Sequence, residues 1–334
     1  MAINVKSCYL FLLNNLDQSF VPTELPLDET VEGAYRFLEK NIGRCIKNAG
    51  GRPAAFKESS VIRKSFLEYR NRSIDFLEFA HRVATRRYDF KNRYELLSAS
   101  DLFLCEVVIK DMEYVVGLEL ACKEGMVHHV NQSEGGLQNN LLLHQSIVPS
   151  ASLSNANFFM IDLDKMTLTI LENMVVTVDD DTYLYADKIL ECETKTSIKE
   201  AVKTARAVAE EIVEEQQLDH LAIIPALERT IKETVNEGED IDFKEVAEEV
   251  FFQSPEAKAQ FISEVASQGI VKPVENHNNV KLPLKKTLRL KTDIGIEITV
   301  PMDYYNNKDY IEVVNTPDGR LAIQIKNIGN IENK

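Results

Sequence analysis

Residues 102–130 read LFLCEVVIKDMEYVVGLELACKEGMVHHV and are rich in β-branched and aromatic side chains. Such side chains favour strands, whereas Lys110–Asp111 and Lys123–Gly125 carry residues that are typical of turns. The stretch therefore predicts a three-stranded antiparallel meander.

The chain ahead of this meander predicts one strand and then helices. Residues 5–13 favour a strand, and Asp28 is suited to cap a helix over residues 29–48. Between residues 58 and 92, apolar positions recur at helical spacing, with a break at residues 71–73. We therefore expect two helices joined by a bend.

Beyond the meander, strands are followed by helices and then by strands again. We expect further strands over 139–148 and 157–171, helices over 194–217, 221–237, 242–252 and 255–268, and closing strands over 285–301 and 309–327. Helices and strands occur in runs, which argues against a doubly wound sheet or a barrel. We predict an α+β protein of two domains. Residues 1–175 would pack helices on an antiparallel sheet, and residues 176–334 would form an acidic helical block that closes in a small antiparallel sheet.

The composition is that of an ordinary globular protein, with 44% hydrophobic and 27% charged residues in a chain of 334. The five cysteines are scattered and show no CxxC spacing, which favours buried thiols in a reducing cytosol over disulfides or a zinc site. The apolar run at residues 8–13 is too short to cross a bilayer. These features predict a cytoplasmic protein without a membrane segment.

The sequence carries no motif of a known catalytic centre. P-loop, GxGxxG, HExxH and GxSxG patterns are all missing. His128 and His129 would point to opposite faces of a strand and cannot easily share a metal with His144. The triplet at residues 179–181 is typical of a solvated acidic turn. We therefore predict no enzyme, no metal and no cofactor; the enzymatic alternative is a metal-dependent nuclease using Asp162, Asp164 or that triplet.

Charge is distributed unevenly along the chain. The net charge is −15, yet residues 33–93 hold fifteen Lys and Arg against six Asp and Glu, a local charge of +9. Residues 191–264 hold nineteen acidic and eight basic residues. Such asymmetry predicts one surface that attracts polyanions on a protein that otherwise repels them.

The basic residues of the helix over 74–89 divide into two groups. Arg82 and Arg86 share a face with Asp75, Glu78 and Asp89, so that face is close to neutral and solvated. The surplus lies at the helix ends and on the preceding helix, and the predicted phosphate contacts there are Arg63, Lys64, Arg70, Arg72, Arg87, Lys91 and Arg93. Basic residues at helix C-termini also complement the helix dipole without any ligand, and that alternative stays open.

A second basic run, KLPLKKTLRLK, spans residues 281–291 and contains no acidic residue. On a strand, Lys285, Arg289 and Lys291 would share one face, and Leu284, Leu288 and Leu290 the other. Lys285, Lys286 and Arg289 are therefore added to the predicted phosphate contacts. A strand protected by lysines at a sheet edge is the alternative.

Several segments together resemble one protein family. They are GEDIDFKEVAEEVF (238–251), AQFISEVASQGI (259–270), the closing stretch 290–328 with its G-I-E-I and G-R-L-x-I strands, FLEYRNRSIDFLEFAHRVATRRY (66–88) and the first part of the meander. In this order they resemble the bacterial nucleoid-associated proteins of the NdpA/YejK type. The resemblance implies association with the bacterial nucleoid, binding of DNA with RNA as a second ligand, and no known enzymatic activity.

Two hypotheses follow for the function. The first is a cytoplasmic nucleoid protein that binds double-stranded DNA with little sequence preference through its basic surface. The alternative is an interaction module whose acidic helices recruit a DNA-processing protein to the nucleoid without direct DNA binding. Family likeness and exposed strand edges favour a homodimer in either case.

Overall fold

The computed structural model of the protein describes residues 2–13, 20–31, 33–93, 99–133, 136–149, 156–175, 181–283, 287–301, 304, 309–315 and 321–330. The chain divides into two compact units, Met1–Lys281 and Leu282–Lys334. The division expected after residue 175 therefore falls inside the first unit.

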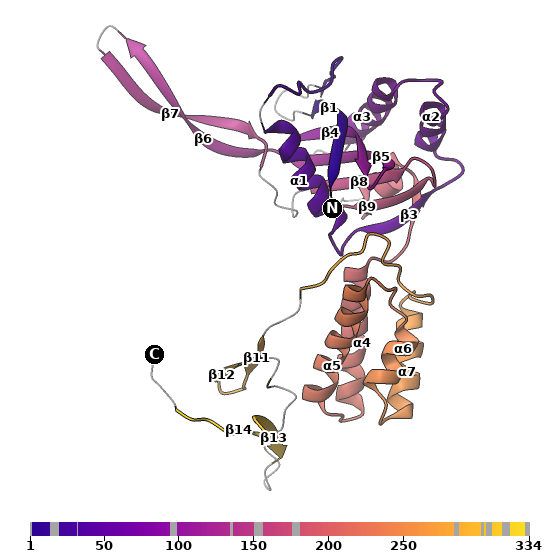
Figure 1. Cartoon of the computed structure of the whole chain (residues 1–334), viewed down its shortest axis with the longest axis vertical. Helices are drawn as coiled ribbons and strands as arrows, with labels where there is room; N and C mark the ends of the chain where they lie inside the picture. Colours follow the sequence, from indigo (N-terminus) through magenta and orange to yellow (C-terminus); the bar gives the residue numbers. More distant parts are fainter. Residues whose placement is uncertain are drawn as a thin grey trace. The chain divides into compact units, whose positions relative to one another are not determined.

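The first unit is built on an eight-stranded antiparallel sheet in the order β10-β3-β9-β8-β5-β4-β1-β2 (Figure 1). The strands are β1 (Ile3–Leu13), β2 (Phe20–Val21), β3 (Arg52–Phe56), β4 (Ser100–Ile109), β5 (Met112–Ala121), β8 (Ala156–Asp162), β9 (Thr167–Leu171) and β10 (Cys192–Thr194). Together with the helices, this sheet confirms the predicted α+β class.

The predicted meander is correct in its first two strands and wrong in its third. β4 and β5 are joined at Lys110 and Asp111, which both have positive φ (49° and 65°), as in the two-residue turns of hairpins. The third segment, β6 (Lys123–Ser133), leaves the sheet and pairs only with β7 (Gly136–Ile147), while β8 takes the place beside β5. The physical reason is that a central strand covered on both faces needs apolar side chains on both, whereas β6 has His128 and Gln132 on one face and His129 and Asn131 on the other.

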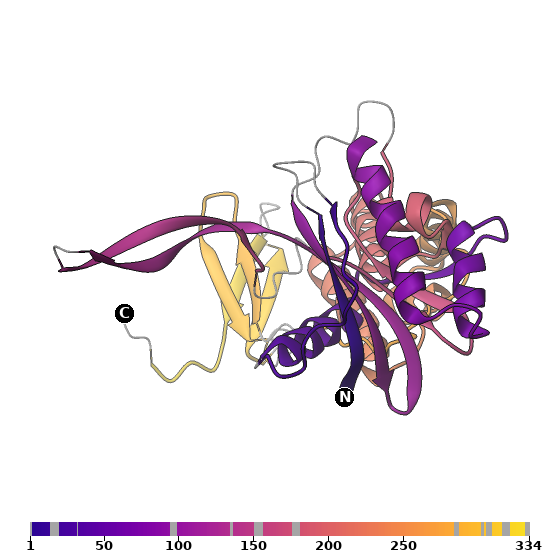
Figure 2. The ribbon, with the colours of Figure 1, turned by 90° about the horizontal axis from the view of Figure 1, so that it is seen from above.

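Helices cover both faces of the sheet, and Figure 2 shows α1 on one side and α2 and α3 on the other. Successive side chains of β4 alternate between two cores: Leu102 and Leu104 pack with α2 (Val61–Arg70), α3 (Phe76–Arg93) and the π-helix Leu184–Ile189. Phe103 and Cys105 pack with α1 (Ala34–Ile46).

The two helices predicted between residues 58 and 92 are confirmed as α2 and α3, with the bend between Arg70 and Phe76. The start predicted for the first helix is wrong. Asp28 accepts hydrogen bonds from the backbone and hydroxyl of Thr30 instead, and α1 begins after Gly33, whose φ of 94° only glycine adopts easily.

Four helices form a bundle in the first unit, α4 (Ile198–Glu215), α5 (His220–Glu237), α6 (Phe243–Val250) and α7 (Pro255–Ser267). Three of these helices begin at a polar N-cap residue. Ser197 and Glu200 form a reciprocal capping box, Asp242 accepts from the Lys244 backbone N–H, and Ser254 caps a helix with Pro255 at its first position.

In the second unit, β11 (Thr287–Lys291) pairs with β12 (Glu297–Pro301), and β13 (Ile311–Asn315) with β14 (Leu321–Ile325). The predicted closing strands are thus confirmed. No helix among the described residues is both long and apolar enough to cross a membrane.

Candidate nucleic-acid interface

Helix α1 presents a continuous basic stripe on its outer face. Its inner face buries Leu38, Ile42, Cys45 and Ile46 against the sheet. At 100° per residue, the side chains at positions 36, 40, 44 and 47 fall within one narrow arc opposite that buried face. All four members of the stripe, Arg36, Lys40, Arg44 and Lys47, are exposed.

These four residues belong to the basic region 33–93, but their arrangement on one helix face was not predicted. The signal was present, because a spacing of four, four and three residues is the period of one helix face. Among the described residues, Arg36, Lys40 and Lys47 form no ion pair. These three cations of the α1 stripe therefore keep a charge that no described carboxylate neutralises.

Two further lysines continue from the end of the α1 stripe. The chain turns after α1, and Ala49 accepts a hydrogen bond (2.8 Å) from the backbone N–H of Lys199 in the first turn of α4. Lys199 and Lys203 are both exposed and stand one helical turn apart. Residues 150 positions apart in the chain thus contribute to the same end of the molecule, which no local pattern indicates.

The predicted contacts on α2 lie on the opposite side of the sheet from the α1 stripe. Lys64, Arg70 and Arg72 are exposed, and Arg63 is half-buried. The guanidinium of Arg70 donates to the backbone oxygen of Asp164 at 2.9 Å, which fixes it beside the β8–β9 turn. The region of +9 is consequently not one surface, because the eight-stranded sheet separates its two halves.

Arg82 and Arg86 are neutralised, as predicted, although only one of the partners was foreseen. Arg82 bonds Glu78 at 3.0 Å, one turn away, and also Glu68 of α2. Arg86 bonds Glu191 at 2.7 Å. Both arginines therefore tie α3 to its neighbours rather than facing a ligand.

The prediction that Arg87 contacts nucleic acid is wrong. Its side chain is among the largest fully buried groups, and the residue is 1% exposed. It donates from Nε (2.8 Å) and Nη2 (2.6 Å) to the two carboxylate oxygens of Glu119 on β5. A guanidinium enclosed in the core and already paired bidentately cannot reach a phosphate.

The same network holds Glu119 ionised in the core. Ser100 and Tyr185 each donate a hydroxyl hydrogen bond of 2.6 Å to its carboxylate. Burial alone would raise the pKa of Glu119, but the charge of Arg87 and these hydrogen bonds outweigh burial and lower the pKa from 4.5 to about 2. The Arg87–Glu119 pair therefore has a structural role, because its hydrogen bonds join α3, β4, β5 and the π-helix.

The remaining predicted contacts are described only in part. The side chains of Lys91 and Arg93, at the end of α3, and residues Lys285 and Lys286 lie outside the described part of the chain. Arg289 is exposed on β11, opposite Thr299 of β12. These positions stay predictions.

The structure offers little for metal or small-molecule chemistry in its described part. No group of three or more His, Cys, Asp or Glu in the described part is arranged to hold a metal ion, and Asp179 and Asp180 of the acidic triplet lie outside that part.

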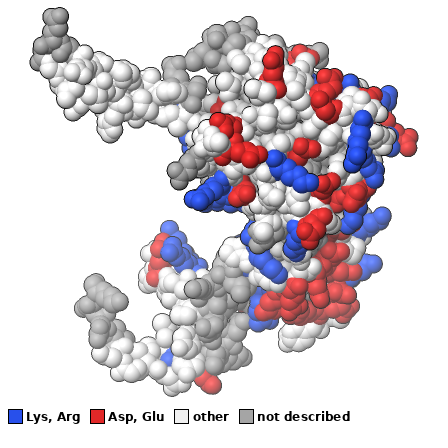
Figure 3. Space-filling model, turned by 45° about the horizontal axis from the view of Figure 1, so that its top comes forward, with Lys and Arg blue, Asp and Glu red and all other residues white. Residues whose placement is uncertain are grey.

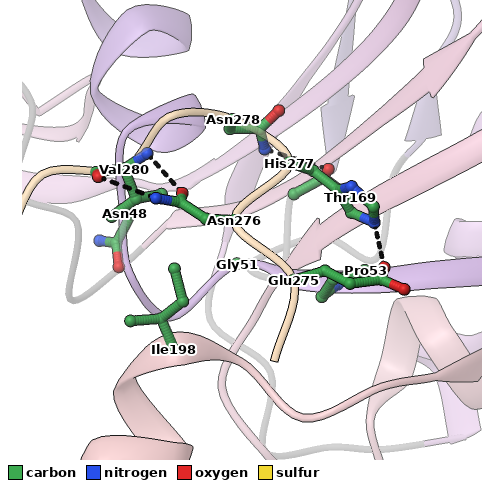
Figure 4. A pocket seen from close by; sticks show the side chains of 10 residues that line it. All are labelled: Asn48, Gly51, Pro53, Thr169, Ile198, Glu275, Asn276, His277, Asn278 and Val280. Carbon is green, nitrogen blue, oxygen red and sulfur yellow. Dashed lines mark hydrogen bonds and ion pairs between the residues drawn. The ribbon is translucent and has the colours of Figure 1, made fainter. Parts of the chain in front are cut away.

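A shallow hollow lies where residues 275–280 cross β3, β9 and the start of α4 (Figure 4). Its polar groups are occupied by one another: the amide of Asn276 bonds backbone atoms of Val280, and Asn278 donates to Thr169 at 3.2 Å. The hollow therefore fastens this segment to the sheet.

Acidic side chains gather on the helical bundle, whereas acidic and basic side chains are interspersed over the part that carries the sheet (Figure 3). The carboxylates of α4 include Glu211, Glu214 and Glu215, and those of α6 include Glu245, Glu248 and Glu249. Glu214, Glu245 and Glu249 are among those exposed. Of the bundle's cations, Arg206 is paired with Glu210 and Glu228. The bundle is therefore a surface that repels polyanions.

The fold and its surface define an α+β protein that separates a basic, sheet-covering helix from an acidic bundle. A scan of protein families identifies the kind of protein to which this architecture belongs. The family model described as nucleoid-associated protein YejK (NA37) matches residues 12–333, so the chain belongs to that family and the predicted resemblance is confirmed. A comparison with curated proteins finds no match.

Proposed function

We propose that the protein binds double-stranded DNA with little sequence preference, through phosphate contacts from the α1 stripe. Membership of a nucleoid-associated family supports DNA as the ligand. The observation that carries the placement is the set of four exposed cations on consecutive turns of one helix, with Lys199 and Lys203 beyond its end. Cations at such positions bind phosphates without contacting base edges, and this kind of binding carries no sequence information.

The dimensions of the stripe suit a short contact with one duplex. From residue 36 to residue 47 the helix rises about 16 Å, at 1.5 Å per residue. A duplex presents a phosphate about every 3.4 Å of axis on each strand, so four to six cations face a run of similar length. The acidic bundle would confine the duplex to the basic side by repulsion.

The test compares two variants with the same reduction in charge. Arg36→Gln/Lys40→Gln/Lys47→Gln removes three cations of the stripe, whereas Arg229→Gln/Lys244→Gln/Lys272→Gln removes three exposed cations elsewhere in the first unit. Binding to a 30-bp duplex is measured by fluorescence anisotropy across a salt series. We expect the slope of log K against log salt to fall in magnitude by about 2.7 for the stripe variant, about 0.9 for each phosphate that is no longer neutralised, and to stay unchanged for the other variant.

A third variant, Arg63→Gln/Lys64→Gln/Arg72→Gln, tests the predicted contacts on α2. If the salt dependence disappears in this variant alone, DNA lies on the α2 side of the sheet and our placement is wrong. If the unaltered protein binds no duplex at low salt, or binds it independently of salt, direct DNA binding is overturned. Parallel titrations with double- and single-stranded RNA determine whether RNA is a second ligand.

The acidic bundle supports a second candidate function, the recruitment of a basic, DNA-processing protein to the nucleoid. The observation that supports this function is that residues 191–264 contain nineteen acidic and only eight basic residues. Localisation in bacterial cells separates the two functions. A stripe variant that no longer binds DNA in solution but stays on the nucleoid favours recruitment through a partner, while loss of both favours direct binding.

The proposal also covers catalysis, localisation and oligomeric state. The protein acts without catalysis, metal or cofactor, in the bacterial nucleoid, and as a homodimer. Two copies on one duplex would double the number of phosphate contacts, so that weak individual contacts become effective together. Incubation of plasmid DNA with the protein and Mg²⁺ or Mn²⁺ tests the nuclease alternative, which requires cleavage.

A further inference from the structure

The hairpin formed by β6 and β7, here called the β6–β7 arm (residues 123–147), differs from every other strand pair of the first unit. Its two strands pair with each other and with no strand of the eight-stranded sheet. Figure 1 shows it projecting beyond that sheet. An isolated two-stranded hairpin is at best marginally stable in water, so an arm of this length needs a surface to pack against.

The two faces of the arm differ in polarity. Residues paired across the strands share a face, and the pairs Met126–Leu143 and His128–Leu141 therefore lie on one face, with Asn140 and His129 on the other. The more apolar face carries Met126, Val130, Leu137, Leu141 and Leu143, each between 56% and 75% exposed, together with the polar His128, Gln132 and Asn139. The polar face carries His129, Asn131, Gln138, Asn140 and His144, with Val127 and Leu142 near its base.

The arm is almost without charge. Residues 123–147 include three charged residues, Lys123, Glu124 and Glu134, although 27% of the whole chain is charged and about seven charges would be average for this length. A DNA-binding ribbon would need Lys or Arg for the phosphates, and a ribbon for a strongly charged protein would need the opposite charge. The apolar face therefore fits an apolar, uncharged surface.

We propose that this surface is the arm of a second copy of the chain, with the two apolar faces packed against each other about a two-fold axis. The face is self-complementary, because an antiparallel arrangement places the base of one arm, at Met126 and Leu143, over the tip of the other, at Leu137. On a chain of net charge −15, two copies can meet along this weakly charged ribbon without bringing acidic surfaces together. Edge-to-edge pairing of the arms would leave the apolar faces in water, so packing face to face covers more of them.

The size of the face sets the expected strength. Eleven residues of strand span about 36 Å, and a two-stranded ribbon is about 10 Å wide. The area of one face is therefore small compared with the roughly 800 Å² that each partner buries in a standard interface. A reversible dimer with a micromolar dissociation constant is the expected result. The inference does not depend on DNA binding, because it uses none of the basic residues.

The test uses neighbouring substitutions of equal charge on opposite faces of the arm. Leu141→Lys places a charge on the apolar face, and Asn140→Lys places the same charge on the polar face. Both positions are at the surface, so neither change disturbs a core, and circular dichroism verifies folding. Sedimentation velocity of the full chain between 1 and 100 µM measures the dissociation constant.

We expect a concentration-dependent dimer for the unaltered chain, at least a hundredfold weakening for Leu141→Lys, and less than threefold for Asn140→Lys. A chain that stays monomeric at 100 µM, or equal weakening by both substitutions, overturns the proposal. Protection of the arm from hydrogen exchange only when duplex DNA is added would assign the face to DNA and overturn it too. The stripe variant should dimerise normally and the Leu141→Lys variant should keep the salt dependence per protomer, so this proposal, which gives an interface to the proposed homodimer, and the proposed DNA binding fail separately.

Discussion

The buried pair of Arg87 and Glu119 gives the sharpest prediction about stability. Removing either charge leaves the other in the core without its partner, which typically costs 3–5 kcal/mol. The lowered pKa of Glu119 leads to a similar figure. A shift from 4.5 to about 2 corresponds to about 3 kcal/mol in favour of the ionised form. We therefore expect Arg87→Met and Glu119→Gln each to lower the free energy of unfolding of the sheet by about 3 kcal/mol.

The double variant tests the reasoning, because it removes both charges together. Gln at position 119 keeps one oxygen that accepts from one of the two hydroxyls, Ser100 or Tyr185, and its amide N–H can donate to the oxygen of the other. The double variant Arg87→Met/Glu119→Gln should therefore cost about 3 kcal/mol less than the sum of the single effects. Urea unfolding of the full chain, with hydrogen exchange of the β5 amides as the readout, reports on the sheet itself. Arg72→Met, an exposed arginine, serves as the control and should change stability by less than about 0.5 kcal/mol.

Two results would refute this account of the pair: single effects below about 1 kcal/mol, or additive effects in the double variant. The pH dependence supplies a second measurement. The folded-state pKa of Glu119 lies below its unfolded value, so its contribution is present above about pH 4.5 and is lost as the pH falls toward 2. Glu119→Gln should weaken that acid-induced loss.

Two further predictions concern other packed groups. Gly117→Ala would place a Cβ atom against the ring of Phe159, closer than two carbon atoms can approach, and should lower the free energy of unfolding in urea by about 1–3 kcal/mol. Gly329→Ala is the control and should be neutral, because its Cβ would meet no atom within 4 Å. Equal effects of the two substitutions would contradict the packing at Gly117. Burial raises the pKa of Glu172 to about 7, although two backbone N–H groups of the π-helix Leu184–Ile189 bond its carboxylate. A folded pKa above the unfolded one means stability that is present below about pH 4.5 and lost as the pH rises through 7, so thermal unfolding of Glu172→Gln should vary less between pH 5 and pH 8 than that of the unaltered chain. Identical pH profiles would exclude Glu172 as the titrating group.

Local sequence information accounts for the order and type of most elements. Helix caps at Ser197, Asp242 and Ser254 and the turn at Lys110–Asp111 depend on residues within a few positions of each other, and such local chemistry can be read from the chain. The family likeness is of the same kind, since it depends on the order of segments. The basic face of α1 was also within reach of the sequence, because its spacing is the helical period.

Only the folded arrangement shows which of the basic residues are available. Arg87 stands in sequence beside the exposed Thr85 and the half-buried Arg86, and only the approach of β5 with Glu119, 32 positions later, makes it a core residue. The helices α1 and α2 are close in sequence, yet the sheet between them places their charges on opposite sides. Strand pairing and burial are contacts between distant positions, so the local pattern of β6 could show a strand but not that it would leave the sheet and form an arm.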